Sequence, residues 1–283
     1  MSGTLYVIGT PIGNLEDMTL RQLRILQEVD FIAAEDTRVT RKLLSHYEMH
    51  TPMVSYHDHS GKLVTQQLLQ RIAAGENCGI VTDAGMPCIS DPGEILVRLC
   101  KEQGIPVTAV PGPSAAITAL AISGQETGRF TFEGFLSVTK KQRQAHLEEL
   151  KTERRTMIFY EAPHKLVRTL TDFANYFGGE RTLSICRELT KLHEEVWKTT
   201  IAEALQRYEA QPPKGEFVLI VAGLPEPAET TDALTMEDAL QRIQERLAAG
   251  ERLTDACKAV AAATGYRKQA LYQAYQKQTE EEA

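Results

Sequence analysis

Short apolar segments alternate with helical patterns from Leu5 to Val110. Five of these segments have the length of strands: Leu5–Ile8, Phe31–Ala34, Met53–Tyr56, Gly79–Thr82 and Val107–Val110. The stretches between them carry helix signals, such as Thr19 before the stripe Leu20, Leu23 and Leu26, Ser60 before the next helix, and Gly75 after it. A parallel strand pair needs a long crossover, usually a helix. The pattern therefore predicts an α/β domain with a mostly parallel sheet.

The pattern changes after about Gly124. Strands are expected at Phe130–Phe135, Met157–Tyr160, Leu183–Arg187, Glu195–Thr199 and Phe217–Val221, with helices near Gln142–Lys151, Lys165–Tyr176 and Ala202–Ala210. No helix separates the strands near Leu183 and Val196, which predicts a mixed sheet. We interpret this part as a second α/β domain, and a cleft between two such domains is a common ligand site.

The end of the chain has a different composition. The Pro-rich polar stretch Gly223–Thr231 is typical of a linker, and three helical patterns follow, the second with Thr254 as its expected cap. We therefore expect domains at 1–122 and 123–224, a linker at 225–234, and a helix-turn-helix-like trihelical domain at 235–283. Arg267 and Lys268 begin the last helix. Contact with nucleic acid and a merely structural role both remain open for this module.

The composition of the chain limits the classes of function that it can have. The chain has 283 residues, 42% of them hydrophobic, so a sizeable core is available. Its five cysteines are odd in number and show no Cys-x-x-Cys spacing, which argues against a disulfide framework and a zinc site. No signal peptide or membrane span is recognisable, so we expect a cytoplasmic protein. The net charge of −7 means that any contact with nucleic acid must be local.

Three predicted strands end in loops rich in Gly and Pro. These loops are Gly9–Asn14, the segment VTDAGMPCISDPG at Val81–Gly93, and VPGPSA at Val110–Ala115. None matches a dinucleotide fingerprint or a P-loop. Open α/β sheets bind ligands at the carboxyl ends of their strands, where such loops meet and allow close approach of a ligand to the backbone. Plain turns are the alternative for any one loop alone.

In combination, these motifs resemble the ribosomal RNA small subunit methyltransferase I family, part of the tetrapyrrole methylase superfamily of S-adenosyl-methionine enzymes. The resemblance rests on GTPIGNL, EDTR, SYHDH, VTDAGMPCISDPG, VPGPSA, FYEAPHKL, RELTKLHEE and KGEFVLIV, and runs from about Leu5 to Val221. The trihelical tail is similar to the C-terminal domain of the family. Met86 and Cys88 stand where the family often has Thr and Gly, so we expect no chemistry from their side chains.

The resemblance implies two α/β domains with S-adenosyl-methionine in the cleft between them, a homodimer, and no metal. It also implies methyl transfer to the ribose 2′-hydroxyl of a cytidine in small-subunit (16S) ribosomal RNA, which an acidic chain fits better within the assembled 30S particle than as naked RNA. By motif position, the expected cofactor-binding residues are Pro11, Asp83, Ala84, Gly85, Met86, Ile89, Ser114, Ala115, Glu161 and Ala162.

A ribose hydroxyl must lose its proton during such a transfer, and a positioned base assists this step. Asp36, His57 and Glu161 are the catalytic candidates because each lies at or just beyond a strand end. Asp36 could instead cap a helix, His57 could be an exposed loop residue, and Glu161 could bind backbone N–H groups. The expected substrate-binding residues are Arg38, Arg41, Lys42 and His59, with a solvated surface as the alternative.

Two functions of other classes remain open from the sequence. The same loops could serve a methyltransferase that acts on a tetrapyrrole or another small molecule. The chain could also be a nucleic-acid-binding regulator whose α/β part senses a ligand. The trihelical tail and the basic residues of the EDTR segment favour a macromolecular substrate, whereas a regulator would need a more basic recognition helix.

Overall fold

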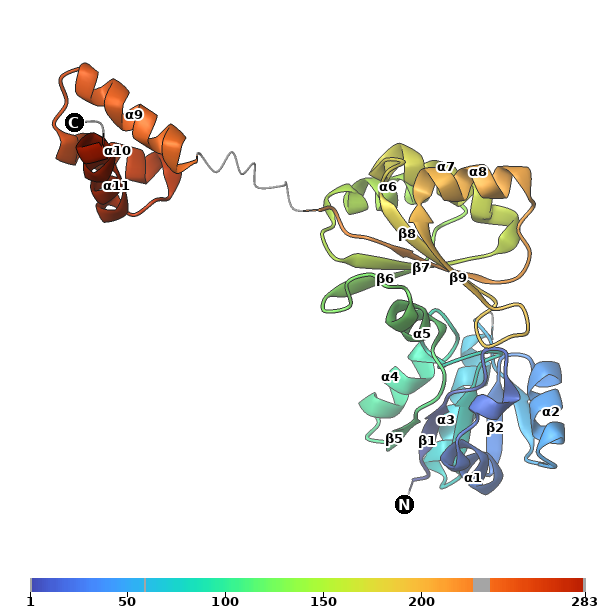
Figure 1. The fold of residues 1–283 in the computed structure, drawn as a ribbon. Coiled ribbons are helices and arrows are strands. Elements are labelled where there is room, and N and C mark those ends of the chain that lie inside the picture. The colour runs from blue at the N-terminus through green and yellow to red at the C-terminus, as the bar shows by residue number, and fades with distance from the viewer. Residues whose placement is uncertain (1, 59, 226–234, 282–283) are drawn as a thin grey trace. The chain divides into compact units, whose positions relative to one another are not determined.

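The computed structural model describes residues 2–58, 60–225 and 235–281. Its contacts divide the chain into two compact units, Met1–Leu224 and Pro225–Ala283. The first unit contains both sheets, and the second contains three helices (Figure 1). Among the described residues, no helix has both the length and the apolar character needed to cross a membrane.

The first sheet is parallel throughout, in the order β3-β2-β4-β1-β5. Its strands are β1 (Leu5–Ile8), β2 (Phe31–Ala34), β3 (Met53–Ser55), β4 (Cys78–Val81) and β5 (Val107–Val110). The helices α1 (Leu20–Glu28) and α2 (Thr37–His46) pack on one face, and α3 (Lys62–Ala73) and α4 (Glu94–Glu102) on the other. The predicted parallel sheet is confirmed, with strand ends shifted by one residue in β3 and β4.

Two of the predicted helix caps are wrong. Thr19 does cap α1, because its hydroxyl accepts from Gln22 N at 3.2 Å. The helix α3 instead follows Gly61, while Ser60 Oγ accepts from His57 N at 2.8 Å and so closes a turn in the preceding loop. In the second unit, α10 follows Arg252, which places Thr254 inside the first turn. A hydroxyl group near the start of a helix can thus form a hydrogen bond within a local turn instead of capping the helix.

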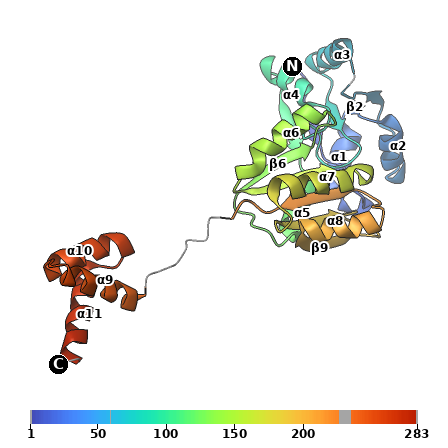
Figure 2. The ribbon, with the colours of Figure 1, turned by 90° about the horizontal axis from the view of Figure 1, so that it is seen from above.

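The second sheet has the order β6-β7-β10-β8-β9. Its strands are β6 (Phe130–Phe135), β7 (Thr156–Glu161), β8 (Thr182–Arg187), β9 (Glu195–Thr200) and β10 (Phe217–Val221). Only β6 and β7 pair in parallel, and the other pairs are antiparallel, which confirms the predicted mixed sheet. The helices α6 (Lys140–Glu149), α7 (Pro163–Phe177) and α8 (Ile201–Ala210) cover one face (Figure 2).

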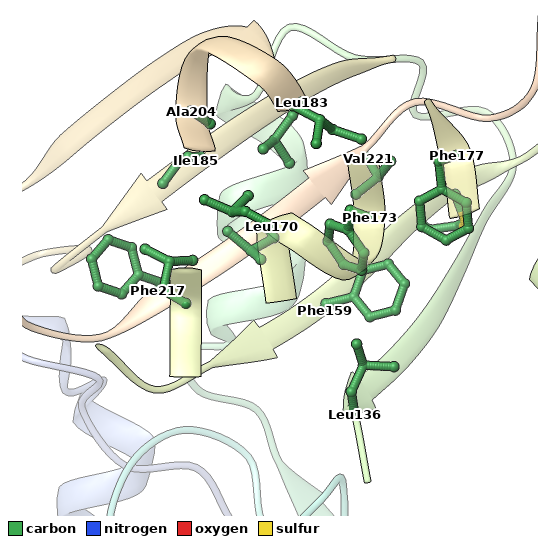
Figure 3. Packing of buried hydrophobic residues seen from close by; sticks show 14 of the residues in the cluster. Leu136, Phe159, Leu170, Phe173, Phe177, Leu183, Ile185, Ala204, Phe217 and Val221 are labelled. Atoms are coloured by element: carbon green, nitrogen blue, oxygen red, sulfur yellow. The ribbon is translucent and has the colours of Figure 1, made fainter. Parts of the chain in front are cut away.

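The core of the second sheet lies between its strands and these three helices. Phe159 of β7 packs against Phe173 of α7 with ring centroids 4.9 Å apart, and Phe177 continues the stack (Figure 3). All three rings are buried. Each aromatic ring of this size removes a large apolar area from water. The opposite face of the sheet is therefore available for other contacts.

Helix α5 (Ala115–Ile122) makes those contacts. It follows β5 of the first sheet, yet Ala116, Ala119 and Leu120 pack against buried residues of β7, β8 and β10. The backbone N–H of Ala116 also donates to the Tyr160 hydroxyl at 3.1 Å. In Figure 1, α5 lies between the two sheets. Helix α5 therefore connects the carboxyl edge of the first sheet to the face of the second sheet that is opposite α6, α7 and α8.

The second unit consists of α9 (Met236–Ala248), α10 (Leu253–Thr264) and α11 (Lys268–Glu281). Their buried residues form one small core. Gly265 ends α10 with φ of +74°, a left-handed conformation that glycine adopts without strain. The linker predicted at 225–234 lies, after Pro225, outside the described residues.

Candidate functional site

The three Gly- and Pro-rich loops meet at the carboxyl edge of the first sheet. Thr10 and Gly85 form an isolated bridge, with N–H···O distances of 2.9 and 3.1 Å. The loops after β1 and β5 touch at Gly9 and Gly112, where a Cβ on Gly9 would lie 2.7 Å from Gly112 Cα. Only residues without a side chain allow this contact. The expectation that these loops lie together at the carboxyl ends of the strands is confirmed.

A cavity of about 510 Å³, here called the main cavity, lies between these loops and the second sheet. Its first-sheet side includes Thr82, and its second-sheet side includes Phe135, Tyr160 and Phe217. The predicted cofactor residues that line it are Asp83, Ala84, Gly85, Met86, Ile89, Ser114, Ala115, Glu161 and Ala162. The structure thus brings together residues from motifs far apart in the sequence.

A second cavity of about 340 Å³, here called the side cavity, adjoins the main one. It is formed by the loop after β1, one face of α2, and Lys191 from the loop between β8 and β9. Pro11 and Lys42 line this side cavity. The residues that line both cavities are Ile12, Thr82, Asp83, Ala84 and Glu216.

Three carboxylates of the main cavity, Glu35, Asp91 and Glu216, are not among the residues predicted from the sequence. Glu35 Oε2 accepts from Thr82 Oγ1 at 2.6 Å and from Asp83 N at 3.2 Å. Glu35 and Asp91 follow strand ends within the EDTR and VTDAGMPCISDPG motifs, so position alone could have suggested them. Their shared orientation toward one cavity follows only from the sheet order.

Two carboxyl groups of the main cavity, Asp91 and Asp83, have raised pKa values. Burial, and then the negative charge of Glu35, raise the pKa of Asp91 to about 6 and also raise the pKa of Asp83. Like charges in a partly desolvated pocket disfavour ionisation. A cationic ligand would relieve this repulsion, and a proton would do the same.

The loop that carries Asp91 has a strained backbone. Cys88 and Ser90 adopt φ of +72° and +60°, which side-chain-bearing residues rarely do. A Cβ on Gly93, the residue after this turn, would lie 2.6 Å from Cys88 Sγ. The turn presents Ile89, which is 55% exposed, as a wall of the main cavity. Strain of this kind persists only where the surrounding structure holds it in place.

Glu161 is buried and fully engaged. Its Oε1 accepts from Ala162 N at 2.9 Å, and its Oε2 accepts from the Thr169 hydroxyl. Arg143, which is 4% exposed and pairs with Asp172, donates to the same hydroxyl at 2.8 Å. Glu161 therefore shapes the wall of the main cavity at the start of α7.

Asp36 and His57 line neither of the two described cavities. Asp36 caps α2, and its carboxylate accepts from the Arg38 side chain, which lowers the pKa of Asp36 to about 2. Its backbone N–H donates to Asp83 Oδ1 at 3.1 Å. His57 is exposed in the turn closed by Ser60.

Some of the predicted substrate-binding residues line a described cavity and others do not. Lys42 lines the side cavity, whereas Arg38 and Arg41 are exposed on α2 and line neither described cavity. His59 lies outside the described residues. Within those residues, no group of three or more His, Cys, Asp or Glu side chains could hold a metal ion.

The profile of the tetrapyrrole (corrin/porphyrin) methylases matches residues 4–205, which contain the first sheet and every strand of the second sheet except β10. The chain belongs to this family. Within it, the chain is 47% identical over 271 residues to "Ribosomal RNA small subunit methyltransferase I" of Synechocystis, with 96% of each chain covered. The relative of the same name from Halalkalibacterium halodurans is 46% identical and covers 96% of this chain and 94% of its own.

A shorter relative of that name occurs in Thermotoga maritima. It is 44% identical over 221 residues, which are 78% of this chain and 99% of its own length. It is therefore too short to contain counterparts of both units found here.

Solved structures of other tetrapyrrole-methylase enzymes share the fold. The uroporphyrin-III C-methyltransferase of Thermus thermophilus superposes with a TM-score of 0.55 at 20% identity, and covers 77% of this chain and 94% of its own. A structure of that enzyme complexed with S-adenosyl homocysteine has the same TM-score at 16% identity, covering 77% and 97%. These comparisons support the predicted two-sheet architecture.

The contact between Gly9 and Gly112 predicts a sharp effect of one methyl group. In Gly9→Ala, the new Cβ would lie 2.7 Å from Gly112 Cα and 2.8 Å from Met86 Sδ, so the loops must separate. We expect a loss of about 1–3 kcal/mol in the free energy of unfolding, measured by urea denaturation. Gly128→Ala is the control, because nothing lies within 4 Å of its Cβ position. Equal stability of the two variants would contradict the described contact.

Asp91 and Asp36 should show opposite dependences of stability on pH. The raised pKa of Asp91 means that its contribution is complete below about pH 4 and is lost as pH rises through about 6. The lowered pKa of Asp36 means that its contribution is present above about pH 4 and is lost as pH falls through about 2. At neutral pH, Asp91→Asn should therefore raise the melting temperature and Asp36→Asn should lower it.

Calorimetric melting at several pH values tests this pair. The advantage of Asp91→Asn should shrink to nothing near pH 4, roughly the ordinary pKa of an aspartate. A constant difference between variant and wild type at all pH values would exclude the electrostatic origin.

Proposed function

We propose that the chain is an S-adenosyl-methionine-dependent methyltransferase that modifies the ribose 2′-hydroxyl of a cytidine in small-subunit (16S) ribosomal RNA. The observation that carries this proposal is the carboxylate-lined main cavity, in a chain 47% identical to a relative named ribosomal RNA small subunit methyltransferase I. The two named relatives described first match almost the full length of the chain, including its second unit.

The main cavity suits this cofactor. Its volume of about 510 Å³ lies within the range of sites for ligands of this size. Glu35, Asp83 and Asp91 offer negative charge to a sulfonium, and Phe135 and Tyr160 offer flat apolar surface to an adenine. The first turn of α5, at Ser114 and Ala115, offers backbone N–H groups to a carboxylate.

When bound, the cofactor would supply a methyl group on a positively charged sulfur to a ribose oxygen whose proton must leave. The residues of the chain hold and orient the reactants, which can supply much of the rate enhancement. The backbone bridge between Thr10 and Gly85 fixes the cavity floor, and the engaged Glu161 fixes the opposite wall. Both walls are thus preorganised.

Asp83 is the proton acceptor that we propose. It lines both cavities, so a group entering from the side cavity meets its carboxylate beside the main cavity. Burial and the charge of Glu35 raise its pKa, which makes it a stronger base than an ordinary aspartate. The backbone N–H of Asp36 holds its Oδ1 in place.

The other catalytic candidates take different parts in this proposal. Asp36 has a pKa of about 2 and positions Asp83 through its backbone, so its carboxylate is a weak base. Glu161 has both oxygens engaged and forms the cavity wall. His57, in the exposed loop after β3, and His59 belong with the RNA-contacting residues, as do Arg38, Arg41 and Lys42.

The remaining parts of the proposal concern partners. We propose that the substrate is the assembled 30S particle in the cytoplasm and that the chain acts as a homodimer. Ile117 and Ile122 of α5 are 52% and 46% exposed, and apolar side chains of this kind are often covered by a partner. The short Thermotoga relative has the same name without room for the second unit, which supports methyl transfer by the first unit.

Binding and transfer assays test the function directly. Calorimetry should show binding of S-adenosyl-methionine to the full chain. Tritiated methyl groups should appear on 30S subunits from cells that lack the protein, and ribose-methylation mapping should place them on a cytidine. Absence of cofactor binding would refute the proposal, whereas transfer to a tetrapyrrole instead of RNA would establish the small-molecule alternative.

The role of Asp83 predicts a specific pH profile. Asp83→Asn should lower kcat by about 10²–10⁴-fold, the usual contribution of a positioned base. Glu35→Gln keeps a hydrogen-bond acceptor but removes the charge that raises the pKa of Asp83. The acidic limb of kcat against pH should therefore move to lower pH in Glu35→Gln. An unmoved limb would assign the proton to another group, and Asp36→Asn, His57→Ala and Glu161→Gln would identify it.

A further inference from the structure

The side cavity has walls of a different character from the main cavity. Its α2 wall carries Val39, Thr40, Lys42 and Leu43, and its opposite wall carries Lys191. We propose that this cavity receives the acceptor nucleoside of the RNA, extruded from its stack, and that the loop 188–194 forms its outer rim. This inference rests on the proposed function, because it assigns the place of the acceptor within that reaction.

The size and connection of the cavity support this assignment. A volume of about 340 Å³ lies at the lower end of the range for small-molecule sites, as one nucleoside requires. Thr82, Asp83 and Ala84 line both cavities, so a ribose seated here would lie next to the main cavity. Enzymes that act on a nucleotide within folded nucleic acid commonly extrude it into such a pocket.

The two lysines of the cavity differ in what they can bind. Lys191 Nζ lies 2.9 Å from Glu188 Oε1 and 3.0 Å from Glu216 Oε2, so its charge is satisfied within the wall. Lys42 is exposed on α2, and no carboxylate in the described part of the chain lies within ion-pairing distance of it. A phosphate next to the extruded nucleoside would be the natural partner of Lys42.

The rim loop is hydrogen-bonded within itself and to the residue before β10, and it lies close to the loop after β1. Thr190 N donates to Glu194 Oε2 at 2.5 Å, and Glu216 N donates to Glu188 Oε1 at 2.9 Å. Glu188 and Thr190 adopt φ of +51° and +65°, which such residues rarely do. A Cβ on Gly13 of the first-sheet loop would lie 2.5 Å from Lys191 Cγ. The strained loop therefore keeps a fixed position beside the cavity.

This loop exposes Leu192, whose accessible fraction is 92%. A single exposed leucine is ordinary on a surface. Here, however, the residue follows Lys191 directly in a loop that is held at the cavity. Proteins that distort nucleic acid often insert an apolar side chain, leucine among them, between neighbouring bases. We assign this role to Leu192.

Kinetics with 30S subunits test the proposal. Lys42→Glu should raise KM for the subunit by about tenfold or more and flatten the logarithmic salt dependence of kcat/KM by about one unit per lost phosphate contact. The affinity for S-adenosyl-methionine, measured by calorimetry, should stay at the wild-type value. Lys101→Glu makes the same charge change in the last turn of α4, which leads into the amino end of β5, and should leave both quantities unchanged.

Leu192 provides the second variant pair. Leu192→Ser should lower kcat/KM for 30S subunits by about five- to tenfold, whereas Leu192→Met keeps an apolar side chain and should retain wild-type activity. If Lys42→Glu and Leu192→Ser both methylate as wild type does, the assignment of the side cavity is wrong although the proposed function stands. If they weaken cofactor binding as much as RNA methylation, the side cavity belongs to the cofactor. A wild-type chain that methylates no RNA would instead overturn the proposed function itself.

Discussion

The close contact of bare backbone at the carboxyl edge of the first sheet determines where every other part of the site can lie. Gly9 meets Gly112 at a distance that no side chain tolerates, and Thr10 pairs with Gly85. These contacts join the loops after β1, β4 and β5 into one floor, and α5 begins directly from the last of them. Helix α5 then packs against the second sheet. The same contacts therefore set the separation between the loops and the second sheet, and the main cavity lies between these two parts.

The carboxylates beside these loops destabilise the protein through their mutual repulsion, but they also give the main cavity a function. Glu35, Asp83 and Asp91 repel one another, and partial burial makes ionisation less favourable still. A cationic ligand gains from this field, since it replaces repulsion by attraction. The same field makes Asp83 more basic than it would be in water. Recognition of a positive charge and acceptance of a proton therefore have one electrostatic origin.

The sequence predicts the fold well because parallel strands, crossovers and loop positions follow from hydrophobic periodicity and Gly/Pro placement. It also finds most of the residues with which the first sheet lines the main cavity, since these residues lie in the loops themselves. Glu35 and Asp91 are not predicted from the sequence, because the order of the strands decides which cavity their side chains face. Local sequence patterns do not encode that order. Asp36 and His57 show the converse: position after a strand places a residue near an edge, but helix capping and a local turn direct these two elsewhere.

In our proposal for the side cavity, the second sheet adds specificity for the acceptor to a binding surface that the loops of the first sheet form. Its inner wall is shared with the main cavity, whereas its rim comes from the loop between β8 and β9. A rim built on strained, hydrogen-bonded backbone loses little entropy when a ligand binds, because the loop is already ordered. Variation in this loop would therefore change which acceptor fits while the floor and the carboxylates remain the same. A fold shared with enzymes whose names specify other acceptors is consistent with such a separation of roles.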